Sequence, residues 1–259
     1  MNEQDDTPWV LLRGLMRDRR HWGPFAALFA SRFAGAPIAA IDFPGNGELH
    51  QQRSLASIDA TADFCRADLR RRGLKPPYRV LAMSMGAMVA ASWATRYPQE
   101  LAACVLINTS LRPFSRFWQR LRPRAYPSVL KMALLQPSPR EAETMVLRLT
   151  TSSRDERVLD DWSAWRAAQP VSKANALRQL AAATRFVTTH EAPTVRTLVL
   201  VGARDGLVSP DCSRQLAAAW GCEIREHPSA GHDLPFDDAA WVVAQVEDWS
   251  RIGSAPTAA

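Results

Sequence analysis

Ser84 is the residue whose surroundings most clearly suggest chemistry. It stands in the segment Val80-Leu81-Ala82-Met83-Ser84-Met85-Gly86-Ala87-Met88, between an apolar run and a run of small residues. A serine on a tight turn from a strand into a helix projects its hydroxyl above the edge of a sheet, and small residues are needed two positions to either side. Ala82 and Gly86 meet that need. The pattern is short and weak alone, so its interpretation depends on partners elsewhere.

A serine hydroxyl becomes a useful nucleophile when a base removes its proton and an acid orients that base. Asp205 follows the apolar segment Thr197–Val201, within Gly202-Ala203-Arg204-Asp205-Gly206-Leu207-Val208-Ser209-Pro210. His232 follows about 27 residues later, within Ala230-Gly231-His232-Asp233-Leu234-Pro235. The order serine, aspartate, histidine, each just beyond a predicted strand, favours a catalytic triad.

Together these segments resemble the motifs of the α/β-hydrolase family. The serine turn is similar to its nucleophile elbow in an Ala-x-Ser-x-Gly form, and the other two are similar to its G-x-x-D-x-x-V-P turn and its Gly-His loop. Asp42-Phe43-Pro44-Gly45-Asn46-Gly47 resembles the family's D-x-P-G-x-G turn, which implies a structural role. The resemblance runs from about Trp9 to Arg251 and implies catalytic roles for Ser84, Asp205 and His232.

Other acids and histidines fit these roles less well. Asp233 and Asp237 are too close to His232 in sequence to reach its far nitrogen easily. Asn108 stands where some relatives keep the acid, and an amide cannot act as one. His21, His50, His190 and His227 do not follow a strand in a Gly-His turn.

Attack on a carbonyl builds negative charge on its oxygen, which must meet preorganised N–H donors. The resemblance implies two such backbone donors, Met85 after the nucleophile and Leu15 in the loop Leu11-Leu12-Arg13-Gly14-Leu15-Met16. Relatives usually carry histidine where this chain has Arg13. Because the donor is a backbone group, the oxyanion hole can survive that change.

Short apolar segments alternate with amphipathic ones, which is typical of an α/β fold with a mostly parallel central sheet flanked by helices. The predicted strands are Trp9–Leu12, Pro37–Asp42, Arg79–Met83, Ala103–Asn108, Thr197–Val201 and Glu223–His227. One predicted helix begins after a capping Ser57 and ends at Arg72. The other predicted helices are Ala87–Tyr97, Pro210–Trp220 and Ala239–Ser250.

The stretch 112–189 breaks this alternation, because it holds helical patterns interrupted by prolines and no predicted strand. We expect a helical cap there, inserted into a core domain formed by residues 1–111 and 190–259. In the family that the motifs resemble, such a cap selects the substrate. Its aromatic residues suggest a pocket for an apolar acyl or aromatic group, with the candidates Phe114, Trp118, Trp162 and Trp165.

The chain has a formal net charge of +6 and a pI near 9.6. Its basic residues are almost all arginine, are spread along the chain and accompany no nucleic-acid motif, so we expect no nucleic-acid partner. Many of them fall in the cap, from Arg112 to Lys173. A basic cap suggests an anionic partner such as an acyl carrier protein or a coenzyme A thioester. The turn Asp205-Gly206-Leu207-Val208 is similar to that of the pimeloyl-carrier-protein methyl ester esterases, and this resemblance implies a basic cap of the same kind.

Four scattered cysteines (Cys65, Cys104, Cys212 and Cys222) indicate neither a zinc site nor a disulfide framework. We expect no metal and no cofactor. The polar, acidic start, Met1 to Thr7, lacks the features of a secretory signal, and no apolar run is long enough to span a membrane, so we expect a cytoplasmic protein.

The function that these residues predict is serine-dependent hydrolysis of carboxylic esters through an acyl-enzyme, the activity of a carboxylesterase. Thioester, C–C and amide hydrolysis use the same triad, and a non-catalytic ligand receptor is the alternative of a different class. The sequence leaves the natural substrate, its acyl chain length and the oligomeric state open.

Overall fold

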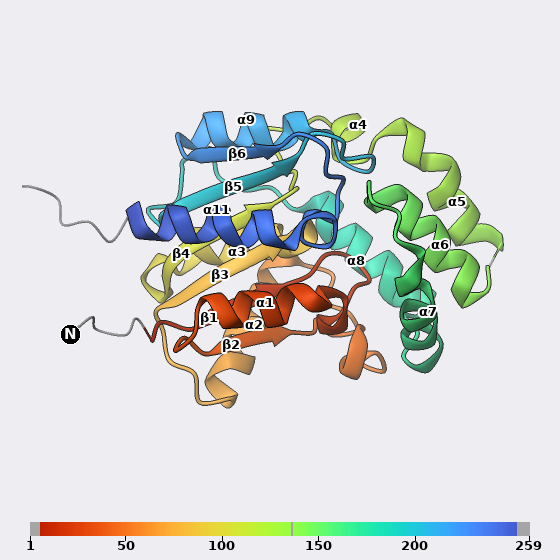
Figure 1. Cartoon of the computed structure of the whole chain (residues 1–259), viewed down its shortest axis with the longest axis horizontal. Coiled ribbons are helices and arrows are strands. Elements are labelled where there is room, and N and C mark those ends of the chain that lie inside the picture. Colours follow the sequence, from red (N-terminus) through yellow and green to blue (C-terminus); the bar gives the residue numbers. More distant parts are fainter. Residues whose placement is uncertain (1–5, 136, 253–259) are drawn as a thin grey trace, which may run out of the picture.

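The fold centres on one parallel six-stranded sheet, seen in a computed structural model that describes residues 6–135 and 137–252 (Figure 1). The strand order is β2-β1-β3-β4-β5-β6, and every neighbouring pair is parallel. The strands are β1 (Trp9–Leu12), β2 (Ile38–Ile41), β3 (Tyr78–Met83), β4 (Leu101–Ile107), β5 (Thr197–Gly202) and β6 (Glu223–His227).

Helices cover both faces of this sheet, because parallel strands are joined by crossovers that return over one face or the other. The helices are α1 (Pro24–Arg32), α2 (Ile58–Arg71), α3 (Met85–Arg96), α4 (Phe117–Arg120), α5 (Tyr126–Leu135), α6 (Pro139–Thr150), α7 (Leu159–Ala168), α8 (Lys173–Arg185), α9 (Pro210–Trp220), α10 (Leu234–Asp237) and α11 (Ala239–Ile252).

Alternate residues of each strand pack into two separate cores. Val10 and Leu12 of β1 belong to the core that α2, α3 and α9 cover. Trp9 and Leu11 belong to the core under α1 and α11, where the ring of Phe29 meets the Trp9 ring edge to face at 5.0 Å. Apart from the largely polar edge strand β6, the strands are mostly apolar on both faces for this reason.

The six predicted strands are all present, with ends that differ by a residue or two. β3 begins one residue earlier than predicted, at Tyr78, and β4 two residues earlier, at Leu101. Asn108 lies just beyond β4 with a positive φ of 46°, which ends the extended conformation there. Helix α3 begins at Met85 instead of Ala87, since the turn at Ser84 leads directly into the helix.

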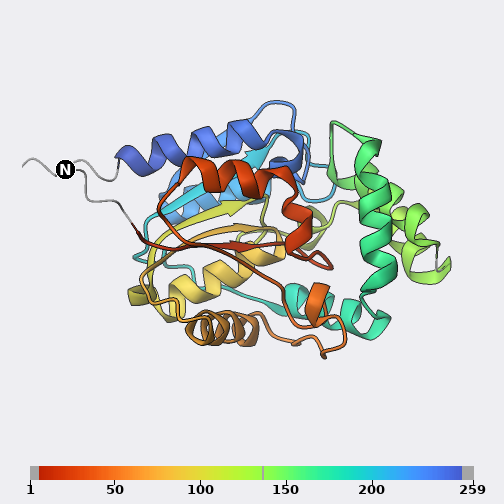
Figure 2. The ribbon, with the colours of Figure 1, turned by 60° about the horizontal axis from the view of Figure 1, so that its bottom comes forward.

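The segment between β4 and β5 contains α4 to α8, which lie together beyond one end of the sheet (Figures 1 and 2). Its two ends meet, because Arg112 and Val187 form an isolated bridge and the Thr188 N–H donates to the Arg112 carbonyl over 2.9 Å. These contacts agree with a cap of residues 112–189 on a core of 1–111 and 190–259, and we keep that division as a proposal.

In the described residues, helices that combine the length and hydrophobicity needed to cross a bilayer are absent. The four cysteines are free thiols, and burial raises the pKa of Cys104 to about 12.

Candidate active site

The turn at Ser84 has the strained geometry that a nucleophile elbow requires. Ser84 joins the end of β3 to the start of α3 with φ 56° and ψ −119°, a backbone conformation that residues other than glycine rarely adopt. A Cβ at Gly86 would lie 2.5 Å from the carbonyl oxygen of Leu12 and 2.6 Å from that of Arg13. Only glycine therefore allows α3 to start against β1, and this packing holds the Ser84 turn in place.

Asp205 and His232 form a buried pair beyond the ends of β5 and β6. Nδ1 of His232 lies 2.7 Å from Oδ2 of Asp205, and both side chains are almost fully buried. A carboxylate only accepts, so Nδ1 carries the proton and Nε2 is left as the basic nitrogen. The other oxygen, Oδ1 of Asp205, accepts the N–H groups of Leu207 and Val208 at 2.8 and 2.9 Å, which fixes the carboxylate.

Asn108 ties the histidine loop to the serine turn. Its Nδ2 donates to the carbonyls of Gly231 and His232 at 3.0 and 2.7 Å, and its Oδ1 accepts the Gly202 N–H. The preceding residue, Ile107, accepts the N–H of Ser84 at 2.9 Å. The sequence excluded Asn108 as the acid, and its observed role is to hold the ends of β3, β4 and β5 and the His232 loop together.

The loop after β1 lies against the Ser84 turn. A Cβ at Gly14 would come within 3.1 Å of Cβ and 3.5 Å of Oγ of Ser84, so the loop backbone approaches that side chain closely. Within the described residues, the N–H groups of Leu15 and Met85 donate no hydrogen bond. The next N–H, that of Met16, donates to Oε1 of Gln179 on α8 at 2.9 Å. The cap thus helps to hold this loop.

Arg13 forms a buried ion pair with Asp233. Its two terminal nitrogens lie 3.1 and 2.6 Å from the two carboxylate oxygens, and each residue is 2% exposed. Burial alone raises the pKa of Asp233, but the Arg13 guanidinium outweighs it and holds that pKa below its ordinary value. This pair joins the loop after β1 to the residue next to His232.

A second buried group of charges joins the same loop to the cap. Arg17 contacts Glu143 of α6 over 2.7 Å and donates to Nε2 of His21 at 3.0 Å, and Arg166 of α7 also contacts Glu143. Because a guanidinium only donates, Nε2 of His21 accepts and this histidine is neutral. Burial, and then the Arg17 charge, lower its pKa to about 4.

The four aromatic pocket candidates lie in three different surroundings. The Phe114 ring packs against those of Trp220 and His190 beside the main core. Trp118 is 43% exposed and stacks with Arg116. Trp162 and Trp165 both contact the ring of His21, next to Arg17. Trp162 and Trp165 are therefore the candidates that share contacts with the loop beside Ser84.

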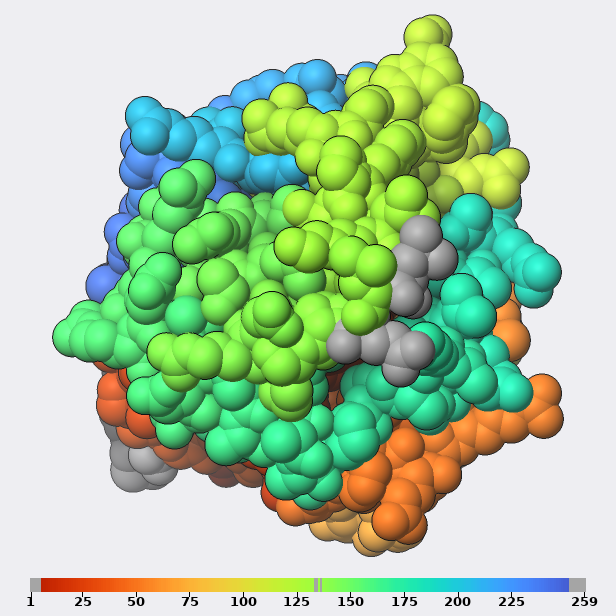
Figure 3. Space-filling model, turned by 90° about the vertical axis from the view of Figure 1, so that its right-hand side faces the viewer, coloured from red at the N-terminus to blue at the C-terminus, as the bar shows by residue number. Residues whose placement is uncertain are grey.

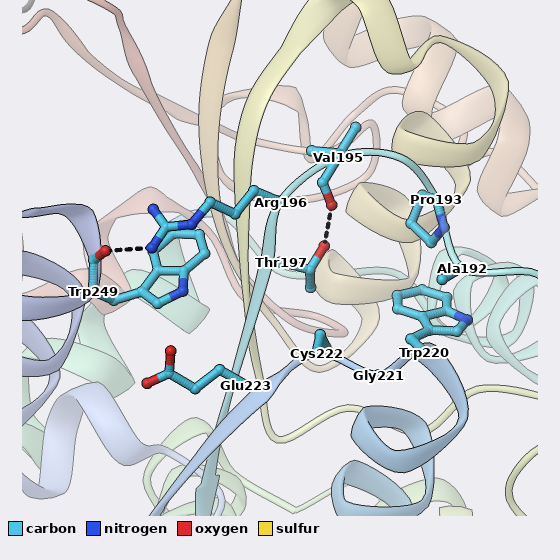
Figure 4. A pocket seen from close by; sticks show the side chains of 10 residues that line it. All are labelled: Ala192, Pro193, Val195, Arg196, Thr197, Trp220, Gly221, Cys222, Glu223 and Trp249. Atoms are coloured by element: carbon cyan, nitrogen blue, oxygen red, sulfur yellow. Dashed lines mark hydrogen bonds between the residues drawn. The ribbon is translucent and has the colours of Figure 1, made fainter. Parts of the chain in front are cut away.

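A separate cavity of about 330 Å³ lies at the other edge of the sheet, around the starts of β5 and β6 (Figure 4). Arg196 stacks on the Trp249 ring at 3.8 Å and donates to the Trp249 carbonyl, while Thr197 donates to the Val195 carbonyl. Neighbouring groups thus already satisfy these polar atoms, and the cavity lies away from Ser84. Among residues 6–135 and 137–252, clusters of three or more potential metal ligands are absent.

The sheet order, the turn at Ser84 and the paired Asp205 and His232 are the arrangement of an α/β hydrolase. The family model described as "Serine aminopeptidase, S33" matches residues 18–239, and the chain belongs to that family.

Two curated bacterial proteins match shorter segments. A pimeloyl-[acyl-carrier protein] methyl ester esterase of Chromobacterium violaceum is 33% identical over 95 residues, which are 36% of this chain and 34% of that protein. The uncharacterized protein YbdG of Bacillus subtilis is 31% identical over 74 residues, 29% of this chain and 23% of that protein. The matches thus span about a third or less of these relatives.

Among solved structures, a thermophilic esterase from Thermogutta terrifontis is similar with a TM-score of 0.74. The match covers 95% of this chain and 90% of the esterase at 24% identity. At that identity the likeness establishes the shared fold.

Proposed function

We propose that this chain is a carboxylic ester hydrolase with Ser84 as nucleophile, His232 as base and Asp205 as the acid that orients it. The observation that carries the proposal is the buried 2.7 Å contact between His232 and Asp205, joined through Asn108 to the strained Ser84 turn. This arrangement supports a role for His232 in which Asp205 holds Nδ1 and Nε2 takes the serine proton.

In the proposed reaction, Nε2 of His232 takes the proton of Ser84 as Oγ bonds to the ester carbonyl carbon. The N–H groups of Leu15 and Met85 stabilise the resulting oxyanion. Collapse breaks the bond to the alcohol, which leaves with the proton from His232. Water, deprotonated by His232, then attacks the acyl-enzyme and releases the acid with Ser84 restored. These steps use side chains and backbone alone, and we propose that they take place in the cytoplasm.

Replacing Ser84 with alanine tests the proposal. The side chain is small, so the folded protein should persist, with an unchanged circular dichroism spectrum and melting temperature. Hydrolysis of p-nitrophenyl esters of several chain lengths should fall by about 10³-fold or more. Retained turnover by the purified, folded S84A protein would refute the proposed mechanism.

The triad does not determine whether the enzyme cleaves an ester, a thioester or an amide. That choice depends on the acyl pocket and on the leaving group. We propose esters because the apolar rings of Trp162 and Trp165 share contacts with the loop beside Ser84 and suit an acyl or aromatic group. Measuring the hydrolysis of matched amides and thioesters in the same screen tests whether esters are the preferred substrates. Faster release from amides or thioesters than from matched esters would reassign the bond while leaving the triad in place.

A carrier-linked acyl ester is the second candidate substrate, since the cap is basic and one relative is named as an esterase of such a substrate. An acidic acyl carrier protein would then dock on the cap.

A further inference from the structure

The exposed apolar side chains of this protein are concentrated on the cap. Eight of the nine large hydrophobic residues that are exposed in the described structure lie between positions 117 and 187. They are Phe117 and Trp118 on α4, Tyr126, Leu130 and Leu135 on α5, Leu177 and Leu180 on α8, and Val187. Phe117, Leu177 and Leu135 are 72%, 66% and 68% exposed. Isolated exposed leucines are ordinary, but such a concentration on one part of a fold marks an interaction surface.

Cations without carboxylate partners occupy the same helices. Residues 112–135 and 171–187 contain nine arginines and lysines and no aspartate or glutamate. They are Arg112, Arg116, Arg120, Arg122, Arg124, Lys131, Lys173, Arg178 and Arg185. Elsewhere most arginines pair with a carboxylate, as Arg66 does with Glu100, but in the described part of the chain none of these nine lies within 4.0 Å of one.

These eight apolar and nine basic residues, here named the cap surface, belong to α4, α5, α8 and the segments that flank them. Three of the cations, Arg120, Arg122 and Arg124, donate to backbone carbonyls, and within the described residues the others are not held in this way. Arg120 of α4 donates to the carbonyls of Ala183 and Thr184 at the end of α8. Figure 3 shows α4 and α5 in yellow-green and α8 in teal on one face of the molecule. This is the face of the cap that points away from the sheet in Figures 1 and 2.

We propose that the cap surface binds the surface of an anionic phospholipid bilayer. Lysine and arginine gain favourable energy beside anionic headgroups, and their long side chains reach phosphates while leucine, phenylalanine and tryptophan enter the acyl boundary. A second copy of this chain is disfavoured, since the cations of one copy would face those of the other. An acidic protein would meet the charge, but seven apolar side chains spread over three helices, with Val187 beyond the last of them, suit a fluid interface into which each inserts separately.

The proposal is tested by sedimenting the purified chain with vesicles of phosphatidylcholine alone or with 30 mol% phosphatidylglycerol. The Ser84→Ala protein serves as the parent, so binding is measured apart from any turnover. We expect it to sediment with the anionic vesicles, to remain in solution with the neutral ones, and to be released by 0.5 M salt. Equal binding to both vesicles, or none to either, overturns the proposal. Binding only to an acidic acyl carrier protein would overturn it in favour of a protein partner.

Two sets of variants separate charge from insertion. Arg116→Gln, Lys131→Gln and Lys173→Gln together should weaken partition about a hundredfold, since each cation contributes about fivefold. Phe117→Ser, Leu130→Gln and Leu177→Gln should weaken it about tenfold or more by removing apolar insertion. Lys75→Gln and Leu28→Gln, both exposed and outside the cap, are the matched controls and should bind as the parent does. If either set of cap substitutions leaves vesicle binding and the melting temperature the same as in the parent, the proposal is contradicted.

Discussion

At the scale of single residues, the three proposed catalytic positions could be singled out from sequence because their motifs are local. A serine between small residues, an aspartate after a strand and a histidine after glycine each mark a local turn. The structure places Ser84 between β3 and α3 and brings Asp205 into contact with His232. The partner of Arg13 could not be predicted in this way. Arg13 and Asp233 are 220 positions apart and lie in two loops whose approach depends on the whole sheet. Gln179 and Asn108 were missed as positioning residues for the same reason.

The Arg13–Asp233 pair should position the loop that carries Leu15 relative to His232. Arg13→Met or Asp233→Leu alone leaves a buried charged partner uncompensated, and each should lower the free energy of unfolding by about 3–5 kcal/mol. The double variant Arg13→Met with Asp233→Leu should be less destabilised than the sum of the single variants, because it buries no lone charge. Urea unfolding of all four proteins measures this.

A purely structural pair would leave the activity of the folded variants intact. Positioning predicts instead that the double variant loses kcat on p-nitrophenyl esters with little change in KM, since the oxyanion donors matter most in the transition state. Additive losses of stability with unchanged kcat would remove the positioning role.

At the scale of elements, five of the strands were predictable because they are mostly apolar on both faces and end in a turn, whereas β6 is a largely polar edge strand. Helix α1 was missed, although Pro24 at its first position and Phe25 and Phe29 four residues apart are the signals that could have found it. The order and packing of the cap helices could not be predicted, because part of their contact with the core is made by polar side chains such as Gln179 and Glu143, whose partners are distant in sequence.

The contact between the loop after β1 and the cap should be sensitive to acid. His21 is buried with a pKa of about 4, against 6.5 for the free side chain. Between these values the unfolded chain binds a proton that the folded chain does not, so stability falls as the pH drops from 6.5 towards 4. The free energy of unfolding should decrease by about 2 kcal/mol between pH 7 and pH 5 from this residue.

His21→Gln removes the titrating group. The free energy of unfolding of this variant, measured in urea, should therefore fall by about 2 kcal/mol less than that of the parent between pH 7 and pH 5. His190→Gln, at an exposed position, is the control and should follow the parent. If the His21→Gln and parent curves run parallel over this range, the acid sensitivity does not come from His21.

At the scale of the whole molecule, charge is divided between the two parts of the fold. The net charge of +6 is smaller than that of residues 112–189 alone, which hold fourteen basic and six acidic side chains. The sequence located this excess in the cap. The structure adds that many of these cations lack carboxylate partners and stand beside exposed apolar side chains, which composition alone could not reveal. The overall basicity of the chain therefore reflects the segment 112–189.

The central claim is that Ser84 is an activated nucleophile, and labelling by a fluorophosphonate tests it most directly. The reagent forms a covalent bond only with a serine whose proton a neighbouring base removes. Intact-mass analysis of the full chain should show one adduct, peptide mapping should place it on Ser84, and Ser84→Ala and His232→Ala should abolish it. A folded protein that stays unlabelled, or that carries the label on another serine, would contradict the account and favour a ligand receptor or a different site.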